Sequence, residues 1–141
     1  MIIKVKKLYS DAQLPQTMRP GDAAMDFYAY KDYELKPGQR VVVETGVAIA
    51  IPLGYWGNVR DRSGLPAKHG IHTMGGVFDA GYRGEYNTHL VNLSDKPYTI
   101  ETGDKVSQLI IYPVEIAELE ESDELSDTSR GEGRFGSTGK K

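Results

Sequence analysis

Short apolar and aromatic segments follow one another along the chain, and helical periodicity is almost absent. The clearest alternation lies in residues 40–51, where Val47, Ile49 and Ile51 are separated by alanines before Pro52, as in a strand. Turn signals at short, fairly regular intervals separate the strands, which is typical of an all-β sandwich or barrel. Further strands are expected from residue 2 and at 25–30, 55–60, 86–93 and 105–114.

One short helix is expected at residues 63–70. Ser63 is a good N-cap residue, Pro66 falls in the first turn, and Gly70 ends the segment. The free N–H groups at the start of this helix, with Arg62 just before, form a candidate anion site. The competing interpretation is a capped surface helix with an arginine nearby.

Residues 75–85 place one carboxylate, Asp79, between an apolar pair and an Ala-Gly turn, with Tyr82 three residues later. Gly81 is expected to adopt a positive φ, so that residues 77–78 pair with the strand from Tyr86 as a β-hairpin. A solvated aspartate in a surface turn is one interpretation. A carboxylate beside phosphate sites also suits a general base for water.

The composition changes near residue 115. Residues 115–127 contain seven acids and no base, so this stretch is too polar to form a core. The last twelve residues then combine glycines, arginines, hydroxyls and one phenylalanine, which suits binding of phosphate and a flat ligand. A disordered tail is the alternative. We therefore expect a domain at 1–115, an acidic arm at 116–129 and a Gly-rich tail at 130–141.

Composition narrows the class of protein. The chain has 141 residues, of which 39% are hydrophobic and 26% charged, as in one soluble globular domain. It contains no cysteine, which fits a cytoplasmic location, or an intracellular one if the protein is viral. No apolar run reaches the length of a signal peptide or membrane span, and a net charge of −3 argues against nucleic-acid binding. His69, His72 and His89 are spaced too weakly to indicate a metal site.

Five segments carry the remaining information, and they occur in a fixed order. They are Ala23-Ala24-Met25-Asp26; Arg62-Ser63-Gly64-Leu65; Gly76-Val77-Phe78-Asp79 with Tyr82-Arg83-Gly84; Gly103-Asp104-Lys105-Val106-Ser107-Gln108-Leu109-Ile110; and the tail from Arg130 to Gly139. Together they resemble the five ordered motifs of the trimeric dUTP diphosphatase (dUTPase) family, over most of the chain.

This resemblance implies a distorted jelly roll of the β-clip type, with one short helix and a flexible C-terminal arm. It implies a homotrimer whose active sites are shared between subunits, and no membrane or nucleic-acid partner. The implied reaction is hydrolysis of dUTP to dUMP and pyrophosphate, in which Mg²⁺ assists attack of water on the α-phosphorus. Its role would be nucleotide-pool sanitation and supply of dUMP for thymidylate synthesis.

The resemblance also implies roles for individual residues. Asp79 would activate the attacking water, Tyr82 would exclude a 2′-hydroxyl, and Asp26 would hold the metal through its water shell. The uracil edge would be bound by the backbone around Gly76, Val77 and Asn87. The phosphates would be held by Arg62, Ser63, Gly64 and Gln108, and the tail residues closing over the substrate would be Arg130, Phe135, Gly136, Ser137 and Thr138, with Phe135 on uracil.

Four residues depart from the family pattern. Ala24 and Arg134 replace common glycines, Gly81 replaces a common acid, and Asp61 replaces a common proline. Asp61 would either weaken phosphate binding or orient the neighbouring guanidinium.

Three other functions stay open. They are a dCTP deaminase-type relative that shares the fold, a non-catalytic nucleotide-binding or regulatory trimer, and a structural jelly roll such as a coat or lectin domain.

Overall fold

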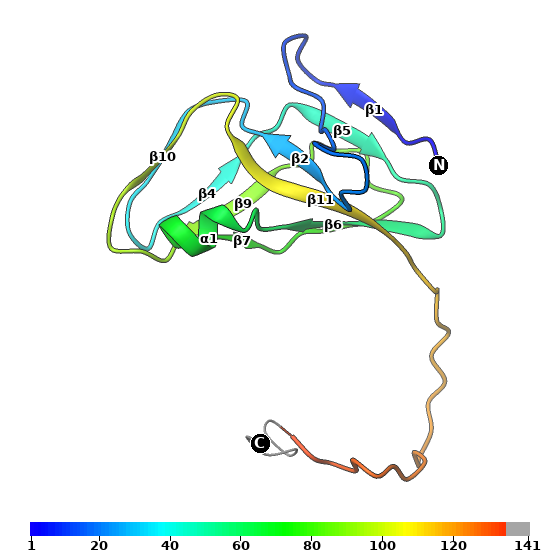
Figure 1. Ribbon diagram of the computed structural model, residues 1–141. Coiled ribbons are helices and arrows are strands. Elements are labelled where there is room, and N and C mark those ends of the chain that lie inside the picture. The colour runs from blue at the N-terminus through cyan, green and yellow to red at the C-terminus, as the bar shows by residue number, and fades with distance from the viewer. Residues whose placement is uncertain (135–141) are drawn as a thin grey trace.

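The computed structural model describes residues 1–134, which contain eleven strands and a single short helix (Figure 1). The all-β prediction is confirmed. The elements are β1 Lys4–Lys7, β2 Met25–Tyr28, β3 Tyr33–Leu35, β4 Arg40–Val43, β5 Val47–Ala50, β6 Tyr55–Arg60, α1 Gly64–His69, β7 Ile71–Met74, β8 Val77–Phe78, β9 Thr88–Asn92, β10 Tyr98–Ile100 and β11 Lys105–Pro113.

The strands are arranged in four small antiparallel sheets. The largest has the order β2-β11-β6-β8, the next has the order β4-β9-β7, and two ribbons pair β1 with β5 and β10 with β3. Because neighbouring strands are far apart in sequence, the sheets bring distant motifs together. Strand β11 lies between β2 and β6, so Gln108 pairs with Asp26 on one side and with Arg60 on the other.

The core lies between these sheets and is built from the inward-facing residues of the alternating strands. Phe27, Ile49, Leu90 and Leu109 are almost fully buried, as is Tyr86. Burying each side chain of this size stabilises the fold by about 1.5–3 kcal/mol. The alternation that predicted the strands therefore also selects the core residues.

The expected strand at residues 40–51 is in fact two strands, β4 and β5. The chain turns between them at Gly46, which has a φ of 72°. The carboxylate of Glu85 accepts the N–H groups of Thr45 and Gly46 at 3.1 and 2.7 Å, which satisfies the backbone groups that the turn removes from the ladder. Strands β3, β7 and β10 were not expected from the sequence.

The expected hairpin between residues 77–78 and the strand from Tyr86 is wrong. Strand β8 pairs with β6, whereas β9 pairs with β4 and β7. Gly81 does not have a positive φ; the positive values belong to Gly75 and Gly76, at 69° and 109°. The bend therefore precedes β8 and directs it onto the edge of β6.

Helix α1 begins and ends where the sequence indicated, but Ser63 at the N-cap position does not cap it with its side chain. Gly70 has a φ of 67° and closes the helix through its N–H to the carbonyl of Pro66. Ser63 has helical angles, and its side chain makes no capping hydrogen bond. The Ser63 hydroxyl is therefore not used by the helix.

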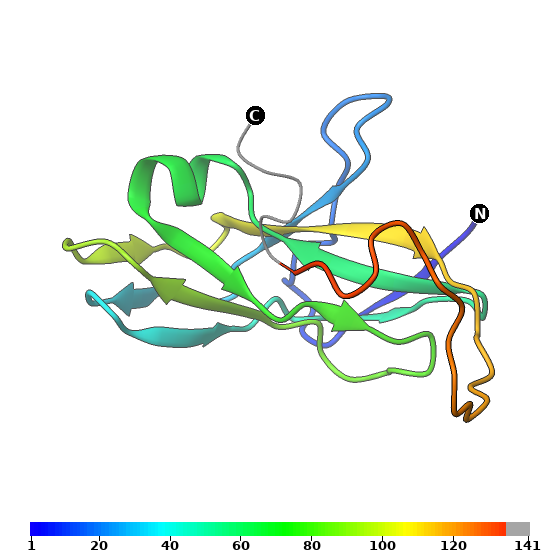
Figure 2. The ribbon, with the colours of Figure 1, turned by 90° about the horizontal axis from the view of Figure 1, so that it is seen from below.

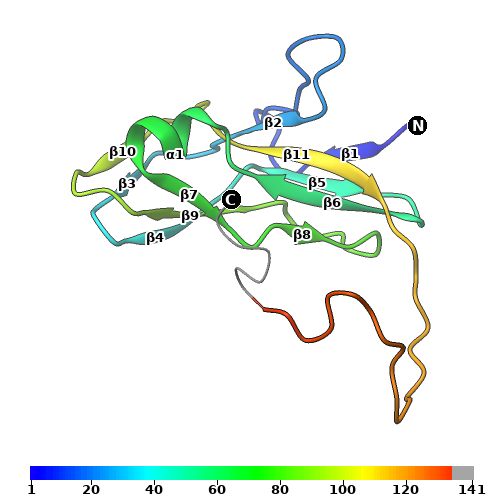
Figure 3. The same ribbon diagram turned by 60° about the horizontal axis from the view of Figure 1, so that its bottom comes forward.

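Two irregular segments leave the body. The loop between β1 and β2 projects from one side (Figure 2), and the segment after β11 runs away from the sheets (Figure 3). In that segment Ile116, Leu119 and Leu125 are 84%, 97% and 91% exposed. None of the helices in residues 1–134 is long and apolar enough to cross a membrane.

Candidate functional site

Eight of the predicted site residues line two different cavities of the chain. A cavity of about 840 Å³ contains Asp26, Arg62, Ser63, Gly64 and Gln108. A smaller cavity of about 230 Å³ contains Gly76, Val77 and Asn87. We call them the phosphate cavity and the base cavity, after the ligand parts that the sequence predicted for their residues.

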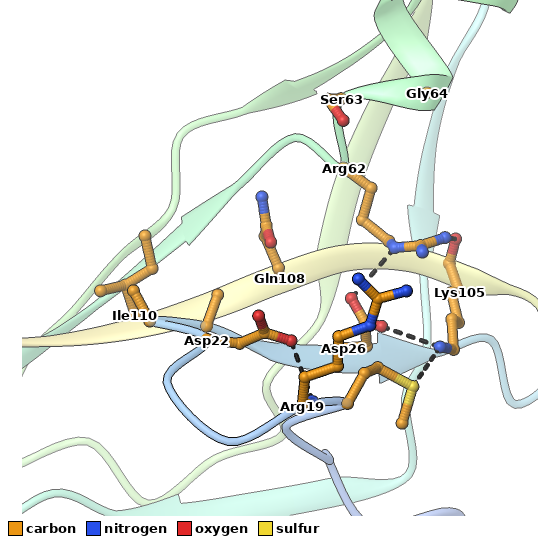
Figure 4. Close-up of a pocket in the computed structure, with 12 residues that line it drawn as sticks. Arg19, Asp22, Asp26, Arg62, Ser63, Gly64, Lys105, Gln108 and Ile110 are labelled. Atoms are coloured by element: carbon orange, nitrogen blue, oxygen red, sulfur yellow. Dashed lines mark hydrogen bonds and ion pairs between the residues drawn. The ribbon is translucent and has the colours of Figure 1, made fainter.

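Asp26 is the centre of charge in the phosphate cavity (Figure 4). It lies on β2 and is 7% exposed. Its Oδ1 accepts a hydrogen bond from Nε of Arg62 at 3.0 Å, and Nζ of Lys105 lies 3.0 Å from its Oδ2. One carboxylate therefore holds two cations at the wall, which leaves one excess positive charge to attract an anion.

Arg62 and Lys105 converge because their strands do. Arg62 follows β6 and Lys105 begins β11, and these strands are neighbours in one sheet. Arg62 Nη1 also donates to the backbone carbonyl of Lys105 at 3.5 Å. The exposed Ser63 and Gly64 lie beside Arg62 at the start of α1. The structure brings these residues together in one cavity with Lys105, which was not expected there although it belongs to the same motif as Gln108.

Asp61 does not orient the Arg62 guanidinium, as one of the two expectations had it. Its Oδ2 lies 2.7 Å from Nδ1 of His72, and its Oδ1 accepts the N–H of Thr73. Burial alone would raise the pKa of Asp61, but the hydrogen bonds from Thr73 and His72 outweigh it, so the pKa is lowered. The carboxylate is thus directed to β7.

The predicted base, Asp79, lies at the start of an exposed turn. The N–H of Tyr82 donates to the carbonyl of Asp79 at 3.1 Å, which closes the turn. The rings of Phe78 and Tyr82 both pack on Tyr86, with centroids 4.1 and 5.7 Å away. The Asp79 carboxylate is exposed, and the turn that carries it is supported by packed aromatic rings. It can therefore contact a ligand without rearrangement of the core.

The base cavity is formed where β8 approaches β6. The N–H of Val59 donates to the carbonyl of Gly76 at 2.7 Å. One buried side-chain oxygen in the lining, Oδ1 of Asn87, has no hydrogen-bond partner within the described part of the chain. Thr73 also lines this cavity, and no pattern in the sequence indicated it.

The described residues contain no group of three acidic or histidine side chains placed to hold a metal. Asp26 is a poor direct ligand, because each of its oxygens already faces a cation. A carboxylate keeps further lone pairs, and Mg²⁺ usually retains several waters. Asp26 therefore fits a metal only through a water molecule.

Of the predicted tail residues, the structure describes only Arg130, which lines neither cavity. Nε of Arg130 donates to the carbonyl of Gly133 at 3.2 Å, within the C-terminal segment itself, and Phe135, Gly136, Ser137 and Thr138 lie outside the described residues.

Comparison with known proteins decides the family. The family model of dUTPase matches residues 10–139. The chain belongs to the dUTPase family. It is 49% identical to the deoxyuridine 5'-triphosphate nucleotidohydrolase of Syntrophotalea carbinolica, over 97% of the chain and 96% of that protein. The corresponding protein of Corynebacterium glutamicum is 45% identical, with 98% and 95% covered.

Solved dUTPase structures share the fold. A dUTPase of Staphylococcus bacteriophage 80alpha, determined with dUpNHpp, superimposes with a TM-score of 0.92 at 30% identity, covering 98% of each chain. A mutant dUTPase from phage phi11 of S. aureus, described as showing coordination of a structural Mg(II) ion, has a TM-score of 0.85 at 27% identity, with 90% and 100% covered. The jelly-roll-like fold class expected for this dUTPase family member is thereby confirmed.

Proposed function

We propose that this chain hydrolyses dUTP to dUMP and pyrophosphate. The observation that supports this most directly is the pairing of Arg62 and Lys105 around Asp26 in a cavity large enough for a triphosphate. Arg62 and Lys105 supply fixed positive charge in the cavity, where a bound polyphosphate develops negative charge during cleavage. Membership of the dUTPase family supplies the substrate class.

In this proposal Asp79 accepts a proton from the water that attacks the α-phosphorus, and the P–O bond to the leaving pyrophosphate breaks. Tyr82 packs against the deoxyribose and leaves no room for a 2′-hydroxyl. The backbone at Gly76 and Val77, with Asn87, binds the uracil edge. A base with the wrong donors would leave these buried groups unpaired, which discriminates steeply.

Arg62, Ser63, Gly64 and Gln108 hold the phosphates in the larger cavity. The Ser63 hydroxyl and two backbone N–H groups of this segment are suited to phosphate oxygens because phosphates accept only. Asp26 would hold Mg²⁺ through a water molecule, and the triphosphate would supply the direct ligands. The ion, when bound, neutralises phosphate charge.

We further propose a homotrimer in which each active site combines parts of different subunits. Within one chain, the phosphate and base residues line separate cavities. Mixing subunits tests this sharing: Asp79→Asn and Arg62→Ala subunits, each inactive alone, should regain part of the activity when dissociated and reassembled together. Sedimentation of the mixture would show the assembly state. No recovery in mixed trimers would mean that each chain has a complete site.

For the C-terminal part, we propose that 1–115 forms the folded domain, 116–129 an arm, and 130–141 a tail that closes over the substrate through Arg130, Phe135, Gly136, Ser137 and Thr138. The three exposed apolar residues of the arm support docking on a neighbouring subunit. Deleting 130–141 should lower kcat/KM far more than the melting temperature. An equal loss of stability would show that the tail is part of the fold. We also propose a cytoplasmic location, since the chain has no cysteine.

The test of the activity is release of pyrophosphate from each dNTP and from UTP, with and without Mg²⁺. We expect dUTP to be cleaved in strong preference to the others, and Asp79→Asn to lose about 10³-fold in kcat while still binding a non-hydrolysable dUTP analogue, since a general base contributes about 10²–10⁴-fold. Release of deaminated product from dCTP, or binding of dUTP without cleavage, would instead support the deaminase or the non-catalytic alternative.

A further inference from the structure

Asp61 connects two sheets at the point where the phosphate-binding segment begins. It follows β6, the strand in the four-stranded sheet, and its carboxylate reaches β7 at the edge of the three-stranded sheet. Its own backbone carbonyl accepts the side-chain amide of Gln108 on β11, at 2.7 Å. One residue therefore contacts β7 through its side chain and β11 through its main chain.

The carboxylate contacts fix the conformation of Asp61. Oδ1 accepts a backbone N–H from the free edge of β7, and Oδ2 is held by His72. The Asp61 side chain is 24% exposed, so water competes only partly for these bonds. Hydrogen bonds to an ionised acceptor are stronger than neutral ones, and the lowered pKa of Asp61 agrees with their strength.

Gln108 depends on where the Asp61 carbonyl lies. The amide of Gln108 has two N–H donors and one acceptor oxygen. One donor is used by the Asp61 carbonyl, so the other donor is directed by that bond. Gln108 lines the phosphate cavity (Figure 4), and a single fixed N–H there is more selective for a phosphate oxygen than a freely rotating amide.

We propose that Asp61 is a positioning residue for the phosphate cavity: anchored to His72 and Thr73, it fixes both the Gln108 amide and the start of the Arg62-Ser63-Gly64 segment. This inference rests on the proposed function. In this arrangement the Asp61 carboxylate faces His72 and not the substrate phosphates. A proline at this position could not make these side-chain contacts, so this chain positions the segment by a different device.

If Asp61 only stabilised the fold, its removal would lower stability without changing phosphate affinity. The experiment separates this structural role from the proposed positioning role. Asp61→Ala removes both contacts with β7. Asp61→Asn keeps an oxygen that can accept the Thr73 N–H. The charge-matched control is Asp11→Ala, because Asp11 also accepts a side-chain hydrogen bond, from Tyr30 at 3.0 Å, but lines neither cavity.

The measurements are the dissociation constant of inorganic pyrophosphate by calorimetry, steady-state kinetics with dUTP, and the melting temperature. Asp61→Ala should raise both the pyrophosphate dissociation constant and KM for dUTP about tenfold, since small misplacements of binding groups are costly. Asp61→Asn should recover most of this loss, and Asp11→Ala should leave both constants unchanged.

Unchanged pyrophosphate affinity in a folded Asp61→Ala variant would overturn the inference, as would equal losses in Asp61→Ala and Asp61→Asn. If Asp61→Ala does not fold, His72→Ala decides, because it removes one of the two side-chain contacts and keeps the carboxylate; an unaltered dissociation constant there also overturns the inference. The pyrophosphate measurement needs no turnover. A wild-type protein that binds pyrophosphate but leaves dUTP intact would therefore contradict the proposed function and not the role of Asp61.

Discussion

The hydroxyl of Tyr82 occupies the space that a side chain on residue 84 would need. A Cβ built on Gly84 would lie 2.4 Å from the Tyr82 oxygen, and that hydroxyl donates to the carbonyl of Glu85 at 3.0 Å. Glu85 in turn binds the turn between β4 and β5. The absence of a side chain at residue 84 is therefore required for the orientation of the tyrosine proposed to recognise deoxyribose.

Replacing Gly84 by alanine should displace Tyr82 while leaving the protein folded. Gly84 does not have a positive φ, and the group that must move is the far end of an exposed side chain. We expect the free energy of unfolding to change by less than about 1 kcal/mol, as for most surface changes. The ratio of kcat/KM for dUTP to that for UTP should fall by about tenfold or more.

Gly81→Ala is the matched control for this prediction. Gly81 lies in the same turn, has no positive φ, and a Cβ there would meet nothing within 4 Å. It should leave the dUTP/UTP ratio unchanged. If Gly84→Ala kept the ratio as well, the observed Tyr82 orientation would have no part in sugar selection.

Gly76→Ala should be far more damaging than Gly75→Ala. Both glycines have positive φ, but a Cβ on Gly76 would lie 2.4 Å from the carbonyl oxygen of Val59, whereas Gly75 has open space. Backbone strain costs about 1–2 kcal/mol at either position, and only Gly76 adds an overlap with backbone, at about 1–3 kcal/mol. Chemical denaturation of the two variants measures the difference; equal losses would mean that β8 can shift away from β6.

Tyr86→Phe should leave stability unchanged or raise it by about 1 kcal/mol. Tyr86 is fully buried, and its hydroxyl has no partner within residues 1–134. Burial raises its pKa to about 12. Removing an unpaired buried hydroxyl removes its desolvation cost, and phenylalanine keeps the stack on Phe78. A loss above about 1 kcal/mol in thermal unfolding would show that this hydroxyl has a hydrogen-bond partner in solution, such as a buried water.

Tyr33→Phe is the contrasting variant. The Tyr33 hydroxyl accepts the N–H of Glu44 at 2.9 Å, so its removal leaves a backbone donor unpaired and should cost about 1 kcal/mol.

The strands that the sequence predicted best are the two longest in the described residues, β6 and β11. The expected strand at 55–60 has the bounds of β6, and that at 105–114 differs from β11 by one residue. Strands β3 and β10 are three residues long, too short for an alternating pattern to stand out. The hairpin was misjudged because the partner of β8 is set by the bend at Gly76, which depends on contacts with β6.

The sequence named candidate site residues but did not show how they are arranged. Asp26, Arg62 and Gln108 come from distant parts of the chain, and the pairing of β11 with both β2 and β6 brings them together. The sequence does not show that Lys105 shares the Asp26 carboxylate, nor that Asp61 is directed to β7. Both depend on which neighbours the sheets supply.

The contribution of Asp61 to stability should depend on pH with a definite sign. Its carboxylate has a pKa below that of the same group in the unfolded chain, because the bonds from Thr73 and His72 outweigh burial. The ionised form therefore stabilises the folded state above the unfolded pKa of about 3.9, and this stabilisation is lost as pH falls through the lower folded value. Between about pH 5 and pH 3 the difference in unfolding free energy between wild type and Asp61→Asn should shrink, because the carboxylate loses its charge there. Denaturation over this acidic range, with the exposed Asp123→Asn as the reference, measures it, and a difference that grew as the pH fell from about 5 to about 3 would show that Asp61 is held in its protonated form.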